Sequence, residues 1–159
     1  MNKFRRKIQI FNGVGWLGFD DREISSLFSV LDSSSFKISK GELSVAFLDK
    51  EAMQNLHRKF SNDSTLTDVI TFVGDKQMNF AGEICVSPDY ALGNYKTYGT
   101  TFSEELSLYL IHGYLHIYGL NDISQDEAKK MREGENICMS LVKNANMLPT
   151  FLTHYSVAK

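Results

Sequence analysis

Residues 101–122, TFSEELSLYLIHGYLHIYGLND, decide the fold of this chain. Apolar side chains fill most positions after Glu105, which predicts a helix buried in the middle of the protein. Thr101 followed three residues later by Glu104 predicts a capping box at the helix start, and Gly119 predicts its end. We therefore expect a central helix on which the other elements pack.

The same stretch carries two histidines at helical spacing. His112 and His116 are four residues apart, so both imidazoles lie on one helix face about one turn apart. Gly119 lets the chain fold back, and Asp122 then offers a carboxylate, which gives the pattern H-x-x-x-H-x-x-G-x-x-D. Two nitrogen ligands and one oxygen ligand around an open fourth position are typical of catalytic zinc sites.

The pattern predicts one divalent ion per chain, zinc before other ions, held by His112, His116 and Asp122, with both histidines catalytic. The alternative is a pair of core histidines with ordinary hydrogen-bond partners. A zincin protease is excluded, because Gly113 stands where the motif H-E-x-x-H needs its glutamate base.

Composition limits the class of protein. A length of 159 residues with 43% apolar content predicts one domain, residues 1–159. Cys85 and Cys138 are too few for a disulfide framework, which favours a reducing compartment. The basic amino terminus lacks an apolar run of signal-peptide length, and no run approaches a membrane span, so we expect a cytoplasmic protein.

Periodicity predicts the remaining elements. We expect strands at 7–12, 42–48, 67–73 and 82–86, and helices at 20–33, 49–60, near 88, 101–119 and 124–143. The β-branched run TDVITFV at 67–73 is typical of a central strand, and the last fifteen residues look loosely structured. The inward side chains of the second and last long helices are predicted as Met53, Leu56 and Phe60, and as Ala128, Met131, Ile137, Met139, Leu141 and Val142.

This order of elements predicts an α+β fold. A small mixed β-sheet of about four strands is covered by about five helices, and the metal site lies on the central helix.

A nucleic-acid partner needs a local basic patch, because the net charge is -2. His57, Arg58 and Lys59 form such a cluster on the helix at 49–60. These side chains either contact RNA or form a solvated helix face.

Three segments resemble a known family. IHGYLHIYGLND, followed by Glu127, Met131 and Glu135, resembles the signature of the YbeY endoribonucleases, H-G-x-L-H-L-x-G-Y-D-H with later Glu, Met and Glu. TDVITF and AGEICVS resemble the T-D-V-L-S-F and L-G-D-I-x-I strands of that family. The resemblance implies a metal-dependent, single-strand-specific endoribonuclease in ribosomal RNA processing, namely 16S rRNA 3′ end maturation, and in late-stage ribosome quality control. It also implies single-stranded rRNA and the ribosome or small-subunit proteins as partners.

The chain departs from the family pattern at three positions. Asp122 replaces the third histidine, which keeps a zinc ligand but adds negative charge, so that a bound water is less acidic. Ser61 replaces a usual arginine, and Gly82-Glu83 replaces Gly-Asp, to which we assign no role. Without that arginine, we expect Arg58 and Lys59 to supply positive charge to the RNA.

In the enzyme hypothesis, the RNA lies beside the TDVITF strand, where Thr67 and Thr71 bind phosphate oxygens. The nucleophile is either a water or the RNA's own 2′-hydroxyl, and the sequence does not separate the two. A second hypothesis is a non-catalytic ribosome assembly factor with a structural metal, and the missing fourth ligand argues against it. A third, a hydrolase of small substrates, lacks an evident general base.

Overall fold

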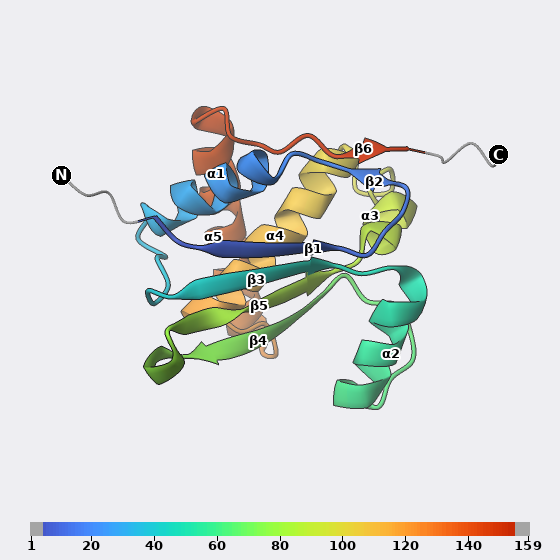
Figure 1. The fold of residues 1–159 in the computed structure, drawn as a ribbon, viewed down its shortest axis with the longest axis horizontal. Helices are drawn as coiled ribbons and strands as arrows, with labels where there is room; N and C mark the ends of the chain where they lie inside the picture. The colour runs from blue at the N-terminus through green and yellow to red at the C-terminus, as the bar shows by residue number, and fades with distance from the viewer. Residues whose placement is uncertain (1–4, 155–159) are drawn as a thin grey trace.

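A four-stranded mixed sheet forms the centre of the molecule in the computed structural model, which describes residues 5–154 (Figure 1). The strands are ordered β1-β3-β5-β4, with parallel pairs β1/β3 and β3/β5 and an antiparallel pair β5/β4. Their bounds are Ile8–Asn12 for β1, Glu42–Phe47 for β3, Val69–Asp75 for β4 and Phe80–Val86 for β5. A separate antiparallel pair joins β2 (Leu17–Gly18) to β6 (Leu152–Thr153).

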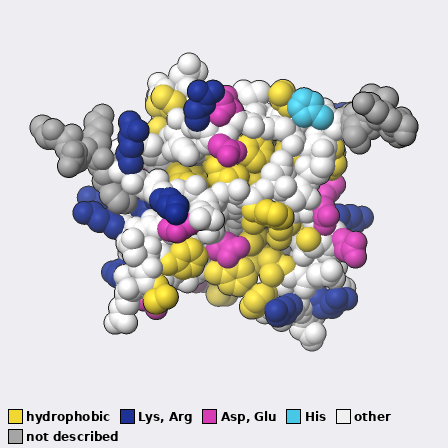
Figure 2. Space-filling model, in the orientation of Figure 1, with side chains coloured by type: hydrophobic (Ala, Val, Ile, Leu, Met, Phe, Trp, Pro, Cys, Tyr) yellow, Lys and Arg dark blue, Asp and Glu magenta, His cyan; other side chains and the backbone are white. Residues whose placement is uncertain are grey.

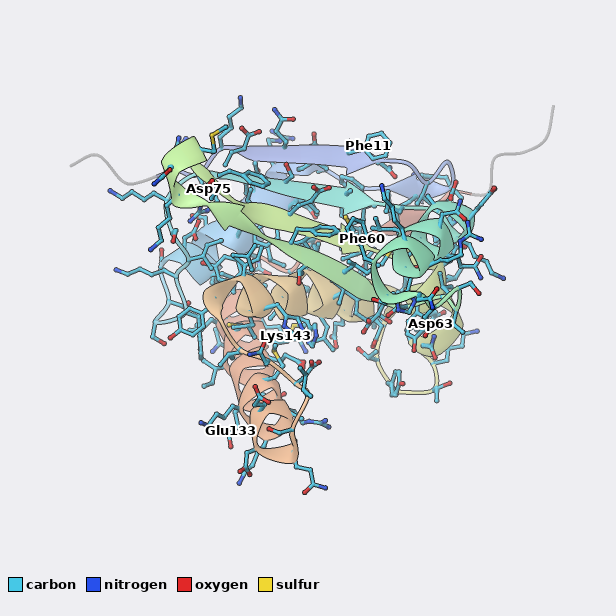
Figure 3. All side chains as sticks on the ribbon, turned by 90° about the horizontal axis from the view of Figure 1, so that it is seen from below. Phe11, Phe60, Asp63, Asp75, Glu133 and Lys143 are labelled. Carbon is cyan, nitrogen blue, oxygen red and sulfur yellow. The ribbon has the colours of Figure 1, made fainter. Side chains whose placement is uncertain are left out.

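Five α-helices pack around this sheet. They are α1 (Asp21–Asp32), α2 (Lys50–Ser61), α3 (Pro88–Asn94), α4 (Phe102–Tyr118) and α5 (Gln125–Asn144), and a short 3-10 turn, η1, spans Lys76–Met78. Figure 3 shows α4 lying between the sheet and α5. The predicted α+β fold with a four-stranded sheet and a central helix is confirmed. Within residues 5–154, every helix is too short or too polar to cross a bilayer.

The two faces of the sheet pack against different helices. Side chains alternate along a strand, so Val45 and Phe47 of β3 point to one face and Ala46 between them points to the other. The first face forms the main core with α1, α4 and α5. The second face forms a small cluster in which Met53 of α2 covers Ala46 and Cys85. Figure 2 shows apolar side chains still exposed on this second face.

Two glycines let α4 approach the sheet closely. A Cβ at Gly113 would lie 2.6 Å from Ile84 Cγ2 and 3.0 Å from Thr71 Cγ2. A Cβ at Gly82, whose φ is 154°, would lie 2.7 Å from Ile117 Cδ1. Because larger side chains would separate helix and sheet, these glycines hold the histidine-bearing face of α4 next to β4.

A buried polar network ties the middle of α4 to the end of α1. The hydroxyl of Tyr114 donates to Asp32 Oδ1 at 2.7 Å, and Arg6 Nε donates to Asp32 Oδ2 at 2.9 Å. The backbone N–H of Ile38 donates to the same tyrosine oxygen at 3.2 Å. Each buried polar group in the network therefore has a partner, which favours one position of α4.

Four local predictions are wrong. β4 is an edge strand, and its β-branched residues at 69–71 are half-buried, by α4 on one face and by the α2 cluster on the other. Phe60 is 56% exposed, because the last turn of α2 projects past the cluster and its ring packs on Phe72. In α5, Ile137 and Leu141 are exposed, whereas Cys138 lies in the buried stripe.

The carboxyl-terminal segment, expected to be loosely structured, is ordered in part. Leu152 and Thr153 pair with β2, and the Phe151 backbone N–H donates to Ser103 Oγ at 2.9 Å. The remainder of that prediction, residues 155–159, lies outside the described residues.

Candidate metal centre

The start of α4 forms one of the two hydrogen bonds of the predicted capping box. The Thr101 hydroxyl accepts the Glu104 backbone N–H at 3.1 Å, as an N-cap does. The Glu104 carboxylate is engaged elsewhere, by the Thr100 hydroxyl at 2.8 Å and by Lys143 Nζ at 3.3 Å. The reciprocal capping box does form at the start of α5, between Ser124 and Glu127, where the same Ser-x-x-Glu spacing predicts it.

Gly119 ends α4 and turns the chain back toward the histidines. Its φ is 125°, and its N–H donates to the carbonyls of Leu115 and His116. The next carbonyl, that of Leu120, accepts a hydrogen bond from His116 Nδ1 at 2.9 Å. The turn therefore orients one imidazole and also delivers Asp122 to the site.

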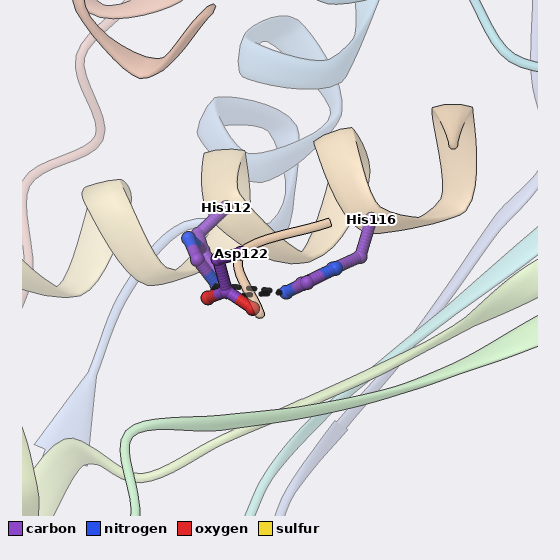
Figure 4. A group of neighbouring side chains, drawn as sticks. All are labelled: His112, His116 and Asp122. Atoms are coloured by element: carbon purple, nitrogen blue, oxygen red, sulfur yellow. Dashed lines mark hydrogen bonds and ion pairs between the residues drawn. The ribbon is translucent and has the colours of Figure 1, made fainter. Parts of the chain in front are cut away.

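The three predicted ligands converge (Figure 4). His112 Nε2 and His116 Nε2 are 2.9 Å apart, and Asp122 Oδ2 lies 3.5 Å from the first and 3.8 Å from the second. Ligand atoms about 2.0–2.1 Å from a tetrahedral zinc ion are roughly 3.3 Å from one another. The observed separations bracket this value, so the donor set fits one small divalent ion.

The opposite ring nitrogens determine how the imidazoles face this point. His116 Nδ1 has the Leu120 carbonyl as its acceptor, and His112 Nδ1 lies 3.7 Å from Glu135 Oε2 on α5. With a proton on each Nδ1, both Nε2 atoms carry lone pairs aimed between the rings. Two such lone pairs 2.9 Å apart repel each other unless a cation or a shared proton lies between them.

The electrostatic field differs at the two histidines. Burial lowers the pKa of His112, but the Glu135 carboxylate outweighs it, with help from Asp68 and Asp122, so the pKa of His112 is raised. The pKa of His116 is lowered by burial and by the neighbouring His112, against the smaller effect of Asp122. Carboxylates thus surround the site and favour a positive charge within it.

Two acidic residues at the site had no role assigned by sequence reasoning. Glu135 approaches His112 from α5, and the side chain of Asp68, just before β4, acts on both histidines electrostatically. Glu135 follows the buried Met131 by four residues, so helical spacing alone places it on the inner side of α5. The contact with His112 depends on how α5 packs on α4, which spacing does not specify.

The predicted RNA contacts Thr67 and Thr71 belong to β4 and the residues just before it, on the strand that packs against α4. Thr71 lies on the face of β4 that packs against Gly113 of α4. The Thr67 hydroxyl donates to Asp68 Oδ1 at 3.3 Å, one residue before the strand. Both threonines are partly exposed along the β4 edge.

Arg58 and Lys59 lie at the end of α2 and are exposed. Arg58 Nη2 donates to Asn55 Oδ1 at 2.9 Å, and Lys59 Nζ is 5.6 Å from the centre of the Phe60 ring. Phe60 packs on Phe72, which points to the sheet face opposite Thr71. Thr71 therefore lies on the face of β4 that packs against α4, the helix of the two histidines. Arg58 and Lys59 lie beside Phe60, which packs on the opposite face.

Comparison with known proteins agrees with this geometry. Residues 19–143 match the family model described as Endoribonuclease YbeY. The Endoribonuclease YbeY of Chlamydia pneumoniae is 37% identical over 119 residues, covering 69% of this chain and 75% of the relative. That of Flavobacterium johnsoniae is 36% identical over 103 residues, covering 64% of this chain and 74% of the relative.

A solved structure has the same fold. The solution structure of TM1509 from Thermotoga maritima superposes with a TM-score of 0.61 at 23% identity, covering 87% of this chain and 90% of the other. The family match spans the helices and strands that build the candidate metal centre, including His112, His116 and Asp122. The chain belongs to the YbeY endoribonuclease family.

Proposed function

We propose that this protein is a zinc-dependent, single-strand-specific endoribonuclease whose ion is held by His112, His116 and Asp122. The observation that carries the proposal is the convergence of two Nε2 atoms and one carboxylate oxygen within 4.8 Å of one another. Three protein ligands leave a coordination position for water or substrate, as in catalytic zinc sites. Membership of an endoribonuclease family supplies the substrate class, RNA.

When bound, the ion supplies a Lewis acid for the scissile phosphate and lowers the pKa of a water. The chain's own residues hold and orient that ion. The Leu120 carbonyl and the Glu135 carboxylate keep the Nε2 atoms of His116 and His112 directed at it. Asp122, with its side chain 45% exposed, completes the donor set from the solvent side.

The RNA strand is proposed to lie along the exposed edge of β4, which is next to α4. Thr67 and Thr71 bind phosphate oxygens there, and Arg58 and Lys59 add positive charge from the end of α2. An exposed edge strand also presents backbone N–H groups that can donate to a phosphate. The nucleophile is a water or the RNA's 2′-hydroxyl.

The cellular role proposed from the family resemblance is 16S rRNA 3′ end maturation and late-stage ribosome quality control. This role places the protein in the cytoplasm with rRNA and the ribosome or small-subunit proteins as partners. The net charge of -2 agrees with binding through a local surface, because a global positive field is absent.

Metal analysis combined with RNA cleavage tests the proposal. We expect about one zinc per wild-type chain and cleavage of single-stranded RNA, and loss of both in His116→Ala, with the thermal unfolding of the metal-free proteins similar. Metal retention without cleavage by the wild type would support the non-catalytic assembly factor instead. Cleavage by a metal-free wild type or by His116→Ala would contradict the proposed site.

A further inference from the structure

A cavity of about 450 Å³ that is lined by charged and aromatic side chains adjoins the candidate metal centre. His112, which is one of the candidate metal ligands, also lines this cavity. The other walls come from α3, α4, α5, the loop after α3 and the segment before β4. Its walls include Asp68, Tyr90, Tyr98, Glu105, Tyr109 and Asn136. A group bound in this cavity would lie next to His112, and so close to a phosphate of RNA bound at the proposed ion.

Hydrogen-bond acceptors dominate the cavity wall. Asp68, Glu105 and Glu135 contribute three carboxyl groups, against the single guanidinium of Arg132. Oδ1 of Asp68 is occupied by the Val69 N–H at 2.8 Å and by the Thr67 hydroxyl. Such a wall repels phosphate and favours a ligand that presents N–H donors.

The wall also holds a buried hydroxyl. Tyr109 is 3% exposed, and its phenol oxygen lies beside Glu105 yet makes no hydrogen bond of good geometry. Burial and then the Glu105 carboxylate raise the pKa of this phenol, so it remains protonated and able to donate. Buried polar groups in proteins almost always have a partner. The Tyr109 oxygen is covered in the structure, so a ligand atom becomes its partner when a neighbouring side chain of the wall moves aside.

Aromatic rings fit the same ligand. Tyr90 and Tyr98 line the cavity, and Tyr98 is 64% exposed, so its ring is free to stack on a flat group. Unpaired RNA bases are commonly stacked on aromatic side chains and read on their polar edges. A second bare metal ion would use neither the rings nor most of the volume.

We propose that this cavity binds one unpaired nucleobase next to the scissile bond and selects bases that carry an amino group. Asp68 and Glu105 accept from the amino edge of adenine, cytosine or guanine, and the Tyr109 hydroxyl pairs with a ring nitrogen or carbonyl. Uracil is disfavoured, because it has no amino group and its single N3–H donor lies between two carbonyl oxygens that the carboxylates repel. The inference rests on the proposed endoribonuclease function and adds its base specificity.

Short oligoribonucleotides test this selection. We compare oligouridylate with the same oligomer carrying a single internal A, C or G, and map the cleavage positions. The wild type is expected to cleave beside the amino-bearing base at least about fivefold faster than within the uridine run, since one well-formed base-edge interaction discriminates by roughly that factor or more.

Two variants isolate the cavity. Tyr109→Phe removes only the unpaired hydroxyl, and Glu105→Gln converts one acceptor into an amide of the same shape. Both are expected to reduce the preference severalfold while metal content stays at the wild-type level. The matched control is Glu133→Gln on the exposed side of α5, which points away from the sheet (Figure 3) and should keep the full preference.

A binding measurement separates this inference from the proposed function. Metal-free protein, prepared with a chelator, is titrated with the fluorescent oligomers, and the A-, C- or G-containing forms should bind more tightly than oligouridylate. Cleavage without base preference, or preference unchanged in both cavity variants, overturns the base pocket and leaves the endoribonuclease standing. If the wild type cleaves nothing, selective binding lost in Tyr109→Phe still supports the pocket, and equal binding of all oligomers refutes it.

Discussion

The two faces of the sheet use side chains in different ways. On the α4 face, His112, His116 and Asp122 converge, and an oxygen lies near the second nitrogen of each imidazole, the Leu120 carbonyl at 2.9 Å from His116 and the Glu135 carboxylate at 3.7 Å from His112. On the α2 face, an apolar groove of about 510 Å³ runs between Phe11, Phe60 and Phe72 and is open to solvent (Figure 2). The α4 face therefore has the features of a catalytic or metal-binding site, whereas the α2 face has an exposed apolar surface with basic side chains beside it.

The difference shows which parts of a site depend on tertiary contacts. On the α4 face, ligand orientation is set by a turn and by a neighbouring helix, so single changes there should have large effects. On the α2 face, the Arg58 side chain bonds to Asn55, Lys59 lies over the Phe60 ring, and both residues are exposed to solvent. Changes there should have small effects that depend on salt concentration.

The largest expected effect comes from removing the carboxylate behind His112. Glu135→Ala should weaken zinc binding about 10- to 100-fold, because the imidazole loses the acceptor that orients it. Glu135→Gln keeps an acceptor and should lose less. Competition with a chromophoric chelator measures both affinities, and equal affinities for wild type and Glu135→Ala would show that the carboxylate does not orient the ligand.

The second effect is the pH dependence of zinc binding. Since the pKa of His112 is raised above its ordinary value of 6.5, a proton competes with the ion already at pH above 6.5. The affinity should fall as pH decreases through that raised pKa, by about tenfold per pH unit once His112 binds a proton. In Glu135→Gln the fall should begin at lower pH, because the charge that raises the pKa is gone.

The pH dependence of the stability of the metal-free protein differs from that of zinc affinity, and the two histidines contribute to it with opposite signs. A folded-state pKa raised at His112 gives stability that is fully present below pH 6.5 and lost as pH rises through the raised value. The lowered pKa of His116 has the opposite effect: its contribution to stability is fully present above pH 6.5 and is lost as pH falls through the lowered value. Competition titrations with a chelator from pH 5.5 to 8 measure the zinc affinity itself. A zinc affinity that stays constant across this range would contradict proton competition at His112.

The third effect sharpens the role of Asp122. Asp122→His restores the histidine typical of the family and should keep zinc bound, because imidazole is also a zinc ligand. A neutral ligand leaves more positive charge on the ion, so a bound water becomes more acidic and the pH profile of cleavage moves to lower pH. An unmoved profile would count against direct coordination by Asp122.

Sequence spacing predicted the convergence of the three side chains because its parts are local. His112 and His116 are four residues apart on one helix, and Gly119 needs only three more residues to bring Asp122 back. Capping signals at Thr101 and Ser124 likewise act within three residues. Such short-range features depend least on the rest of the chain. Even so, Thr100 and Lys143 engage the Glu104 carboxylate that was expected to complete the first cap.

Features that depend on packing between elements were missed. The position of β4 at the sheet edge follows from strand order, which its β-branched composition does not reveal. The contact of Glu135 with His112 needs the α4/α5 crossing, and the exposure of Phe60 needs the place where α2 leaves the sheet. A single sequence contains no direct signal for these distances.

The smallest expected effect is on the α2 face. Arg58→Ala with Lys59→Ala should weaken single-stranded RNA binding several-fold at moderate salt and leave the zinc content unchanged. If each side chain neutralises one phosphate, the slope of log affinity against log salt becomes shallower by about 0.7 for each phosphate that is no longer neutralised. The alternative, a solvated helix face, predicts the wild-type slope.

The control for this double variant removes the same charge elsewhere. Lys129→Ala with Lys130→Ala changes two exposed lysines on α5, so both double variants shift the net charge equally. A general loss of positive charge lowers RNA affinity alike in the two, whereas phosphate binding by α2 lowers affinity and salt slope only in the Arg58 and Lys59 variant. Fluorescence titrations at several salt concentrations distinguish these results. Equal salt slopes in the wild type and both double variants would show that α2 does not bind the RNA, and would leave the β4 edge as the proposed binding surface.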